Sequence, residues 1–435
     1  MVEYKNILIS AADKLILKAE DFIIEPKKII FITGDSGIGK SLFMKYLAGV
    51  IDFHENIESN GEVIFDKINI ISHLDFYTNS DDFVHIGQDV ENFVTGIFCE
   101  DEIACSIKAD SYEESVEKAR EFLLKFNKNL IGRRIGTLSQ GELQELILFG
   151  AIISKKKYIF LDEPFARLDR FERKKIASLI KKITEENNTS FIISGHGVET
   201  IYLDFENIFK IENQKIIIEN KTNILSKLYK HKIKREKIYQ QKDILVQFEN
   251  LDYSIEGRKI LENFSGKIYK GEITSFTGLN GAGKTTLAKI LCGDKKIQKG
   301  KISNIINNVV FIDKNPDFHF LFNNLEQEIE STLDNTENNI FEKLGLNPKS
   351  NYRQLSFGQK MRFLMLLYSN MEQREVFIFD ESFSGQDSNG INLLIEIFME
   401  LKRKGKSIIV IGQDNFYFRG FCDKTIYIKK YNEKN

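Results

Sequence analysis

The sequence predicts an α/β protein in which one kind of domain occurs twice, each copy with a mostly parallel sheet and flanking helices. Three observations lead to this prediction. The chain has 435 residues, 42% of them apolar, which is enough for two ordinary cores. Residues 6–34 align without a gap to residues 250–278, at an offset of 244. Strand-like apolar runs then alternate with amphipathic helix-like runs in both copies, as in parallel sheets with crossover helices.

The strand-like runs end at comparable landmarks in both copies. We predict strands at 158–161, 190–194, 273–276, 376–379 and 407–411. A Leu-Ser-x-Gly sequence occurs at 138–141 and again at 355–358. An Asp-Glu pair follows a strand in each copy. The distance from the serine of the Leu-Ser-x-Gly sequence to this aspartate is 23 residues in one copy and 24 in the other. The protein is therefore predicted to be a tandem repeat.

A glycine-rich loop begins each copy's series of landmarks. Residues 34–41 read G-x-x-x-x-G-K-S and residues 278–285 read G-x-x-x-x-G-K-T, each after an apolar strand. The glycines let successive backbone N–H groups point at a phosphate, the lysine adds positive charge, and the hydroxyl is a ligand for Mg²⁺. The predicted phosphate-binding residues are Gly34, Asp35, Ser36, Gly37, Ile38, Gly39, Lys40, Ser41, Leu42, Gly278, Asn280, Gly281, Ala282, Gly283, Lys284, Thr285 and Thr286.

Composition and charge exclude several classes of protein. The formal net charge is −2, from 61 basic and 63 acidic residues, so a general polyanion-binding surface is not expected. No apolar run approaches the roughly 18 residues of a membrane span, and the first residues lack a signal-peptide layout. We therefore expect a cytoplasmic protein. The four cysteines form no metal-binding or redox pattern and are expected to be reduced.

Taken together, the landmarks resemble two nucleotide-binding domains of an ATP-binding-cassette (ABC) protein fused in one polypeptide, over nearly the whole chain. The resemblance implies an ATPase with ATP and Mg²⁺ as cofactors, and it implies an antiparallel β subdomain and a small helical subdomain in each copy. We expect the domains at 1–220 and 246–435, joined by a basic linker at 221–245. Residues 227–242 of this linker contain seven Lys or Arg and one Glu. The run is either a solvated connection or a contact for nucleic acid or lipid headgroups.

The resemblance also implies a role for each polar landmark of the first copy. Lys40 would hold the β- and γ-phosphates, and Glu163 would polarise the attacking water. Gln88 would contact Mg²⁺ and the water, and His196 the γ-phosphate. The expected metal ligands are Ser41, Gln88 and Asp162 in the first copy and Thr285 and Asp380 in the second. The expected catalytic residues are Glu163, His196 and Gln88, with Glu381 in the second copy.

The second copy departs from the family at two of these positions. Lys314 aligns with Gln88, and an ammonium group has no acceptor with which to coordinate Mg²⁺. Gln413 aligns with His196, and an amide cannot share a proton near neutral pH. The second copy should therefore bind ATP better than it hydrolyses it.

In this family the two domains pack head to tail, so that each nucleotide lies between one copy's glycine-rich loop, called the P-loop, and the other copy's Leu-Ser-x-Gly sequence, called the signature. The first P-loop would face Ser356, Gly358 and Gln359, in a signature followed by the expected Arg362. The second would face Ser139 and Gly141, in a signature where Gln140, Glu142 and Glu145 replace the usual Gly, Gln and Arg. We therefore predict a pseudo-dimer within one chain, with one competent and one degenerate ATP site.

The residue that stacks on adenine also differs between the copies. Tyr253 stands where the family keeps an aromatic residue, and such stacking contributes roughly 1–3 kcal/mol. Its counterpart in the first copy is Ile9. Either stacking is weaker at the first site or Tyr4 substitutes, and the sequence leaves both possibilities open.

Residues 88–96 and 102–104 resemble most closely the ATPases of energy-coupling-factor importers. We expect an energising subunit at the inner face of the membrane, with a coupling protein and a substrate-binding protein as membrane partners and no nucleic acid. Phe93, Val94, Ile97 and Phe98, beside the acidic residues 100–102, would dock a basic helix of the partner, unless they simply pack within the domain. The alternative is a soluble, ribosome- or RNA-associated tandem ABC ATPase. The short linker, and the loss of Gln and His in one copy only, favour transport.

Overall fold

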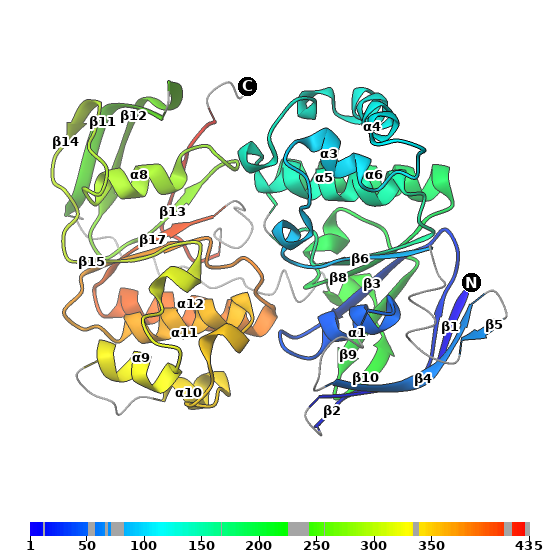
Figure 1. The fold of residues 1–435 in the computed structure, drawn as a ribbon. Helices are drawn as coiled ribbons and strands as arrows, with labels where there is room; N and C mark the ends of the chain where they lie inside the picture. The colour runs from blue at the N-terminus through cyan, green and yellow to red at the C-terminus, as the bar shows by residue number, and fades with distance from the viewer. Residues whose placement is uncertain are drawn as a thin grey trace. The chain divides into compact units, whose positions relative to one another are not determined.

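The computed structural model describes residues 1–11, 14–50, 57–65, 68–70, 82–166, 168–224, 243–255, 257–333, 339–412 and 420–430. Contacts between residues divide the chain into two compact units, Met1–Leu228 and Tyr229–Asn435 (Figure 1). The basic run of the predicted linker, from residue 227 to 242, lies outside the described residues.

The first unit is built on a six-stranded sheet of order β10-β9-β3-β8-β7-β6. Its strands are β3 (Ile29–Gly34), β6 (Phe83–Ile86), β7 (Tyr158–Asp162), β8 (Ser190–Gly195), β9 (Asn207–Glu212) and β10 (Lys215–Ile218). All neighbours are parallel except β9 and β10. Every residue of β3, β7 and β8 is buried, as expected for strands covered on both faces.

A second, antiparallel sheet covers one side of this unit. It has the order β2-β1-β4-β5 and consists of β1 (Val2–Ala11), β2 (Lys14–Ile24), β4 (Ile57–Phe65) and β5 (Ile68–Ile70). The strands β1 and β2 are 10 and 11 residues long, and the register of β1 with its neighbours shifts at two places. Helix α1 (Lys40–Leu47) buries Phe43, Met44 and Leu47 in one core with residues of both sheets.

The remaining helices of the first unit form the helical part of the domain. They are α3 (Cys99–Ala104), α4 (Tyr112–Phe126), α5 (Gln140–Ile153) and α6 (Arg170–Asn187), with 3₁₀ turns η1 (Val90–Phe93), η2 (Lys128–Leu130), η3 (Ile135–Thr137) and η4 (Val198–Ile201). Side chains fix where three of these α-helices begin: Ser111 caps α4, Ser139 caps α5, and Asp169 accepts the N–H groups of Phe171 and Glu172 at the start of α6.

The second unit repeats this plan. Its parallel sheet has the order β15-β16-β17-β13-β18, with β13 (Ile273–Thr277), β15 (Val309–Ile312), β16 (Val376–Asp380), β17 (Ser407–Ile411) and β18 (Lys424–Tyr427). Its antiparallel sheet contains β11 (Ile244–Ile255), β12 (Arg258–Tyr269) and β14 (Lys299–Ile302). The helices are α8 (Lys284–Leu291), α9 (Leu325–Thr332), α10 (Ile340–Leu344), α11 (Phe357–Ser369) and α12 (Ser388–Arg403), with η5 (Pro316–His319) and η6 (Tyr352–Gln354).

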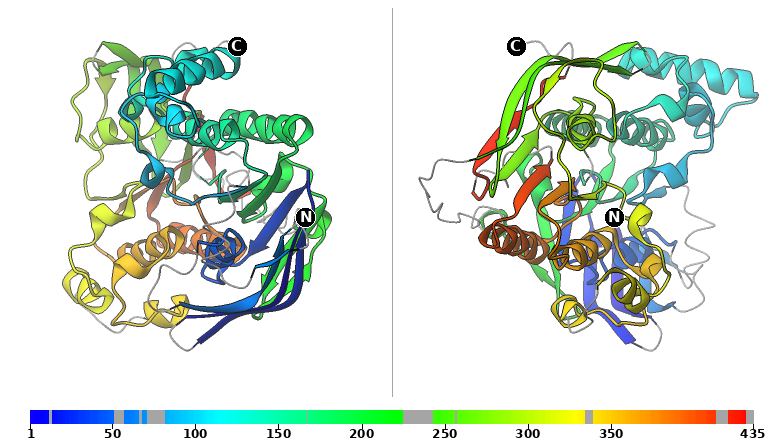
Figure 2. Two further views of the ribbon diagram at one scale, coloured as in Figure 1. Left: turned by 45° about the vertical axis from the view of Figure 1, so that its right-hand side comes forward. Right: turned by 90° about the vertical axis from the view of Figure 1, so that its left-hand side faces the viewer.

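Two cores flank the parallel sheet of the second unit. One joins α8 to β11, β12 and the near face of the sheet, so that α8 lies between two sheets (Figure 2). The other joins α11 and α12 to the opposite face. The predicted α/β class and its duplication are thus confirmed. Among the described residues, none of the helices combines the length and apolarity that a bilayer crossing requires.

Candidate functional site

The first P-loop connects β3 to α1. The ammonium of Lys40 is buried within it and donates to the carbonyl oxygens of Gly34 at 2.9 Å and Asp35 at 3.1 Å. Gly39 has φ +103°, and a Cβ there would lie 2.5 Å from Cγ2 of Ile16, so this position requires glycine. No side chain caps the start of α1. Its first N–H groups and the lysine therefore form a site suited to a phosphate.

The second P-loop has the same construction. Lys284 donates to the carbonyl oxygens of Gly278 and Leu279, both at 2.9 Å. Gly283 has φ +96°, and a Cβ there would lie 2.6 Å from Cγ2 of Ile260. The predicted phosphate-binding residues of each copy thus lie on one loop and the helix start that follows it.

Two oxygen donors meet beside the first P-loop. The hydroxyl of Ser41 hydrogen-bonds the carboxylate of Asp162, which ends β7. Asp162 is buried, and burial raises the pKa of this carboxyl above its ordinary value. Hydroxyl and carboxylate oxygens are the hard ligands that Mg²⁺ prefers, so these residues fit the ion.

Glu163 lies at the centre of the polar residues that the sequence predicted. Its Oε2 accepts a hydrogen bond from Nε2 of Gln88 at 3.0 Å, and its Oε1 lies 3.0 Å from Nε2 of His196. The three residues follow β6, β7 and β8, at the carboxyl ends of parallel strands, where α/β folds place their sites. The backbone of Glu163 has φ +50°, a left-handed conformation that is unusual for glutamate and found at functional sites.

Glu199 is a polar residue of this region that the sequence reasoning missed. Its carboxylate is fully buried and accepts the N–H of Gly197 at 2.9 Å. Burial raises the pKa of Glu199, and His196 is close enough to oppose this effect. A Cβ on Gly195 would lie 2.3 Å from the carboxylate, so glycine makes room for it. Its position three residues after His196 is the feature of the sequence that could have indicated it.

The second copy holds its aspartate differently. Thr285 donates to Oδ2 of Asp380 at 2.5 Å, but Oδ1 is buried without a hydrogen-bond partner. Burial, followed by the nearby Glu381, raises the pKa of Asp380 to about 7. Lys314 is exposed and close enough to lower this pKa, in line with its alignment to Gln88. The other predicted substitution, Gln413, lies outside the described residues.

The two signature sequences begin helices in the same way. Ser139 and Ser356 cap α5 and α11, and each forms a reciprocal capping box with the residue three positions later, Glu142 or Gln359. Gly141 and Gly358 lie so close to Glu172 and Gly385 that a Cβ would clash. Their pairing with the P-loop of the other copy stays a prediction.

The unusual Glu145 of the first signature has its own partner. It is buried and binds Nζ of Lys175 at 2.8 Å, whereas Arg362 of the second signature lies 3.3 Å from Asp387. The signs of the charges are exchanged between the copies, and neither side chain lacks a counter-ion. The ion pair of Glu145 therefore joins α5 to α6 beyond its first turn, whereas the ion pair of Arg362 joins α11 to the start of α12.

The structure decides one alternative for adenine stacking. Tyr4 is fully buried against Phe22 and Tyr46, and its hydroxyl donates to the carbonyl of Leu47. The hypothesis that Tyr4 stacks on adenine is therefore wrong. Tyr253, by contrast, is partly exposed on β11, with Nζ of Lys295 5.9 Å from the ring centroid.

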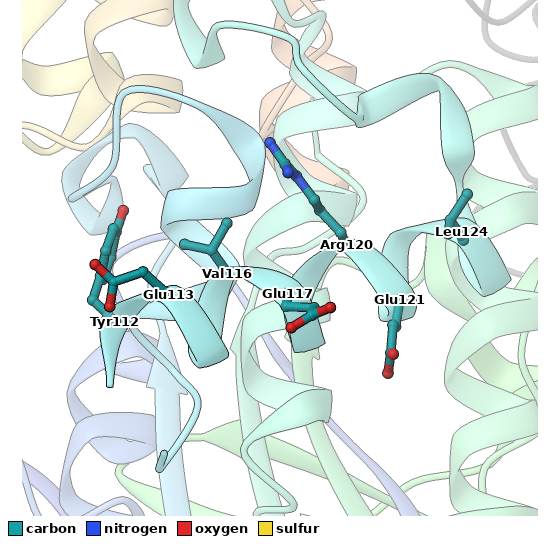
Figure 3. Close-up of a pocket in the computed structure, with 7 residues that line it drawn as sticks. All are labelled: Tyr112, Glu113, Val116, Glu117, Arg120, Glu121 and Leu124. Carbon is teal, nitrogen blue, oxygen red and sulfur yellow. The ribbon is translucent and has the colours of Figure 1, made fainter. Parts of the chain in front are cut away.

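A surface pocket elsewhere in the first unit contains no predicted site residue. Figure 3 shows that it lies along α4 and is lined by Tyr112, Glu113, Val116, Glu117, Arg120, Glu121 and Leu124. It is an exposed face of one helix and carries none of the phosphate-binding features.

Comparison with known proteins identifies the class. The sequence model of the ABC transporter family matches residues 17–166 and 261–384, which is more than half of the chain. The protein therefore belongs to this family, carries its ATP-binding domain twice, and is an ATPase.

Relatives match over most of the chain. It is 26% identical to a provisionally named ABC transporter ATP-binding protein of Clostridium perfringens, over 93% of this chain and 84% of the relative. A similarly named protein of Saccharolobus solfataricus is 27% identical, over 96% and 90% of the two chains.

Solved structures share the fold. An archaeal ribosome recycling factor, aABCE1, solved in complex with ribosomal stalk protein aP1, superposes with a TM-score of 0.67 at 20% identity, over 94% of this chain and 85% of that one. A model of ribosome-bound archaeal Pelota and ABCE1 gives 0.73 at 19% identity, over 97% and 77%. At this identity the likeness extends to the fold alone.

Proposed function

We propose that the protein is the ATPase subunit of a membrane transporter, of the energy-coupling-factor importer type, with one competent and one degenerate ATP site. The observation that carries this proposal is a pair of exposed apolar segments, one in each unit, that follow the aligned residues Gln88 and Lys314. We call residues 91–98 and 317–324 the docking segments.

Each docking segment presents large apolar side chains to solvent. The exposed residues are Phe93, Ile97 and Phe98 in the first unit and Phe318, Leu321 and Phe322 in the second. Ile97 is 68% exposed and Leu321 79%. Apolar side chains gathered at the corresponding place of two units favour a protein partner. Ordinary packing within the domain buries more than half of Phe93, Phe98 and Phe322 but leaves Ile97, Phe318 and Leu321 largely exposed.

A buried glutamate holds each docking segment in place. Glu102 accepts the N–H groups of Thr95 and Gly96, both at 2.8 Å. Glu328, which follows Lys314 by the same 14 residues that separate Glu102 from Gln88, accepts those of Leu321 and Phe322 at 2.9 Å. Paired charge-assisted hydrogen bonds of this kind fix a loop firmly. The apolar side chains are therefore presented in a defined conformation.

The structure corrects the expected charge of the docking surface. Glu100 and Glu102 are buried, and Glu100 accepts the N–H of Gly132 at 2.8 Å. Of the three acidic residues expected to meet a basic partner helix, Asp101 alone is partly exposed. Apolar contact therefore contributes more to the proposed docking than charge does.

Hydrolysis is assigned to the first P-loop. Mg²⁺, held by Ser41 and Asp162, would neutralise phosphate charge there. Glu163 orients the attacking water and takes up its proton, and the hydrogen bond from Gln88 holds this carboxylate at the end of β7. In the second copy Lys314 replaces the glutamine, which supports a site that binds ATP but turns it over slowly.

Two further observations bear on the choice of partner. The relatives that match most of the chain are named as transporter ATP-binding proteins. The ribosome-associated proteins share the fold at 19–20% identity, which does not carry their partners to this chain. The energy-coupling-factor type is supported by the sequence of residues 88–96 and 102–104.

The test is fractionation of cells that produce the protein or one of three variants. We expect the wild type to sediment with membranes and to leave them as a complex in mild detergent. Ile97→Glu and Leu321→Glu should release the protein from membranes, because each places a charge on a docking segment. Phe171→Glu is the matched control, since Phe171 is also 68% exposed but lies on α6. Sedimentation with ribosomes, reversed by nuclease, would instead support the RNA-associated alternative.

A further inference from the structure

Ser194 bridges the two acidic residues of the first unit. It lies near the end of β8, opposite Asp162 in the parallel register with β7. Its hydroxyl donates to Oδ1 of Asp162 and accepts the backbone N–H of Glu163 at 3.1 Å. One buried side chain thus fixes both the expected metal ligand and the backbone from which the expected general base projects.

The second unit lacks this bridge. In the same register, β16 pairs Asp380 with Ile411 of β17. The isoleucine side chain offers no hydrogen bond, and Oδ1 of Asp380 is buried without a partner. The N–H of Glu381 donates instead to the backbone carbonyl of Ile411 at 2.9 Å. The copy predicted to be degenerate is therefore the copy without the hydroxyl.

We propose that Ser194 is a positioning residue for ATP hydrolysis, and that its replacement by Ile411 is a further cause of the difference between the two ATP sites. The inference rests on the proposed roles of Asp162 and Glu163. A residue that hydrogen-bonds a metal ligand typically affects metal affinity or activity by roughly 10- to 100-fold when it is removed. Here the same hydroxyl also restrains Glu163, whose backbone is left-handed at φ +50°.

The same strand provides a matched control. Ser190 is also fully buried, and its hydroxyl donates to the carbonyl of Glu25 at 3.0 Å, at the opposite end of β8. Ser190→Ala and Ser194→Ala each remove one buried hydroxyl from one strand. A purely structural role predicts similar effects of the two substitutions on unfolding and on turnover.

The experiment compares steady-state ATPase activity of the full chain, with its membrane partners where these co-purify. We expect Ser194→Ala to lower kcat by about 10-fold to 100-fold, with little change in the KM for ATP. Ser194→Thr, which keeps the hydroxyl, should retain most of the turnover. Ser190→Ala should leave turnover unchanged. Equal kcat values for the two alanine variants, or a Thr variant that folds as stably as the Ala variant but is no more active, would overturn the proposal.

A second readout does not depend on turnover. In a Lys284→Ala background, which disables the second P-loop, Mn²⁺ binding with a non-hydrolysable ATP analogue is followed by electron paramagnetic resonance. We expect Ser194→Ala to weaken Mn²⁺ binding and Ser190→Ala to leave it unchanged. Glu163→Gln, assayed in parallel, separates the two hypotheses. If Glu163→Gln retains turnover, the proposed catalytic role of Glu163 fails. If Glu163→Gln loses turnover but Ser194→Ala retains both turnover and Mn²⁺ affinity, the positioning role of Ser194 fails.

Discussion

Replacement of Glu163 by glutamine should abolish most ATP turnover, whereas Glu381→Gln should cost far less. In the first unit, glutamine keeps the volume of the side chain but cannot accept a proton. One of its two terminal atoms also becomes a donor facing a donor on Gln88 or His196, which lie 3.0 Å from the carboxylate oxygens. Loss of a general base alone typically lowers the rate by about 10²- to 10⁴-fold, so we expect a decrease of roughly 10²-fold or more.

The second unit supplies the comparison for this prediction. Glu381 has the same left-handed backbone, with φ +51°, but its copy has Lys314 in place of the glutamine and Ile411 in place of Ser194. Little hydrolysis is expected there, so Glu381→Gln removes little. The assay is steady-state ATPase activity of both variants in the assembled complex, with thermal unfolding as the control for folding. Equal losses would refute the asymmetric arrangement and indicate two coupled, equally active sites.

Three other predictions concern the second copy. Lys284→Ala should lower turnover more than Glu381→Gln in the same assay, because it removes the bound nucleotide and not only its cleavage. Tyr253→Ala should weaken ATP binding at the second site by about 1–3 kcal/mol, measured by titration in a Lys40→Ala background; an unchanged affinity would exclude stacking. Burial raises the pKa of Asp380 to about 7, so between about pH 4 and pH 7 the folded protein holds a proton that the unfolded chain has released. The free energy of unfolding therefore falls as the pH rises through this range. Asp380→Asn should therefore raise the unfolding temperature of the nucleotide-free protein more at pH 8 than at pH 5, and an equal shift at both would contradict this.

The P-loops and the strands that lead to them could be predicted from the sequence because their signals are local. Glycine spacing, a following lysine and an apolar run are all contained within about a dozen residues. The spacing of the family's landmarks predicts Gln88 and His196 as site residues with Glu163. In the structure these two residues, 75 and 33 positions away from Glu163 in the sequence, lie within hydrogen-bonding distance of its carboxylate.

Other features depend on which way a side chain points and could not be predicted. Ser194 and Ile411 both fit a buried strand, and only the register with the neighbouring strand shows that one of them reaches an aspartate. Tyr4 was a candidate for a ligand contact, but β1 directs it into the core against α1. Glu102 reads as a surface charge on a short helix, yet the hydrogen bonds that it accepts from Thr95 and Gly96 in the preceding loop hold it inside. In each case the direction of the side chain depends on a partner from another part of the fold.

The left-handed backbone at Glu381 has a consequence for how the two copies tolerate mutation. An L-residue pays about 1–2 kcal/mol for this conformation, which glycine adopts freely and asparagine adopts more readily than most residues. In the first copy, exchange of the glutamate is expected to abolish most hydrolysis. In the second, Glu381→Gly or Glu381→Asn should relieve the strain with little functional loss. If the two sites differ as proposed, selection on turnover constrains the first half of the chain more than the second, which makes the second half the better starting point for stabilising the protein.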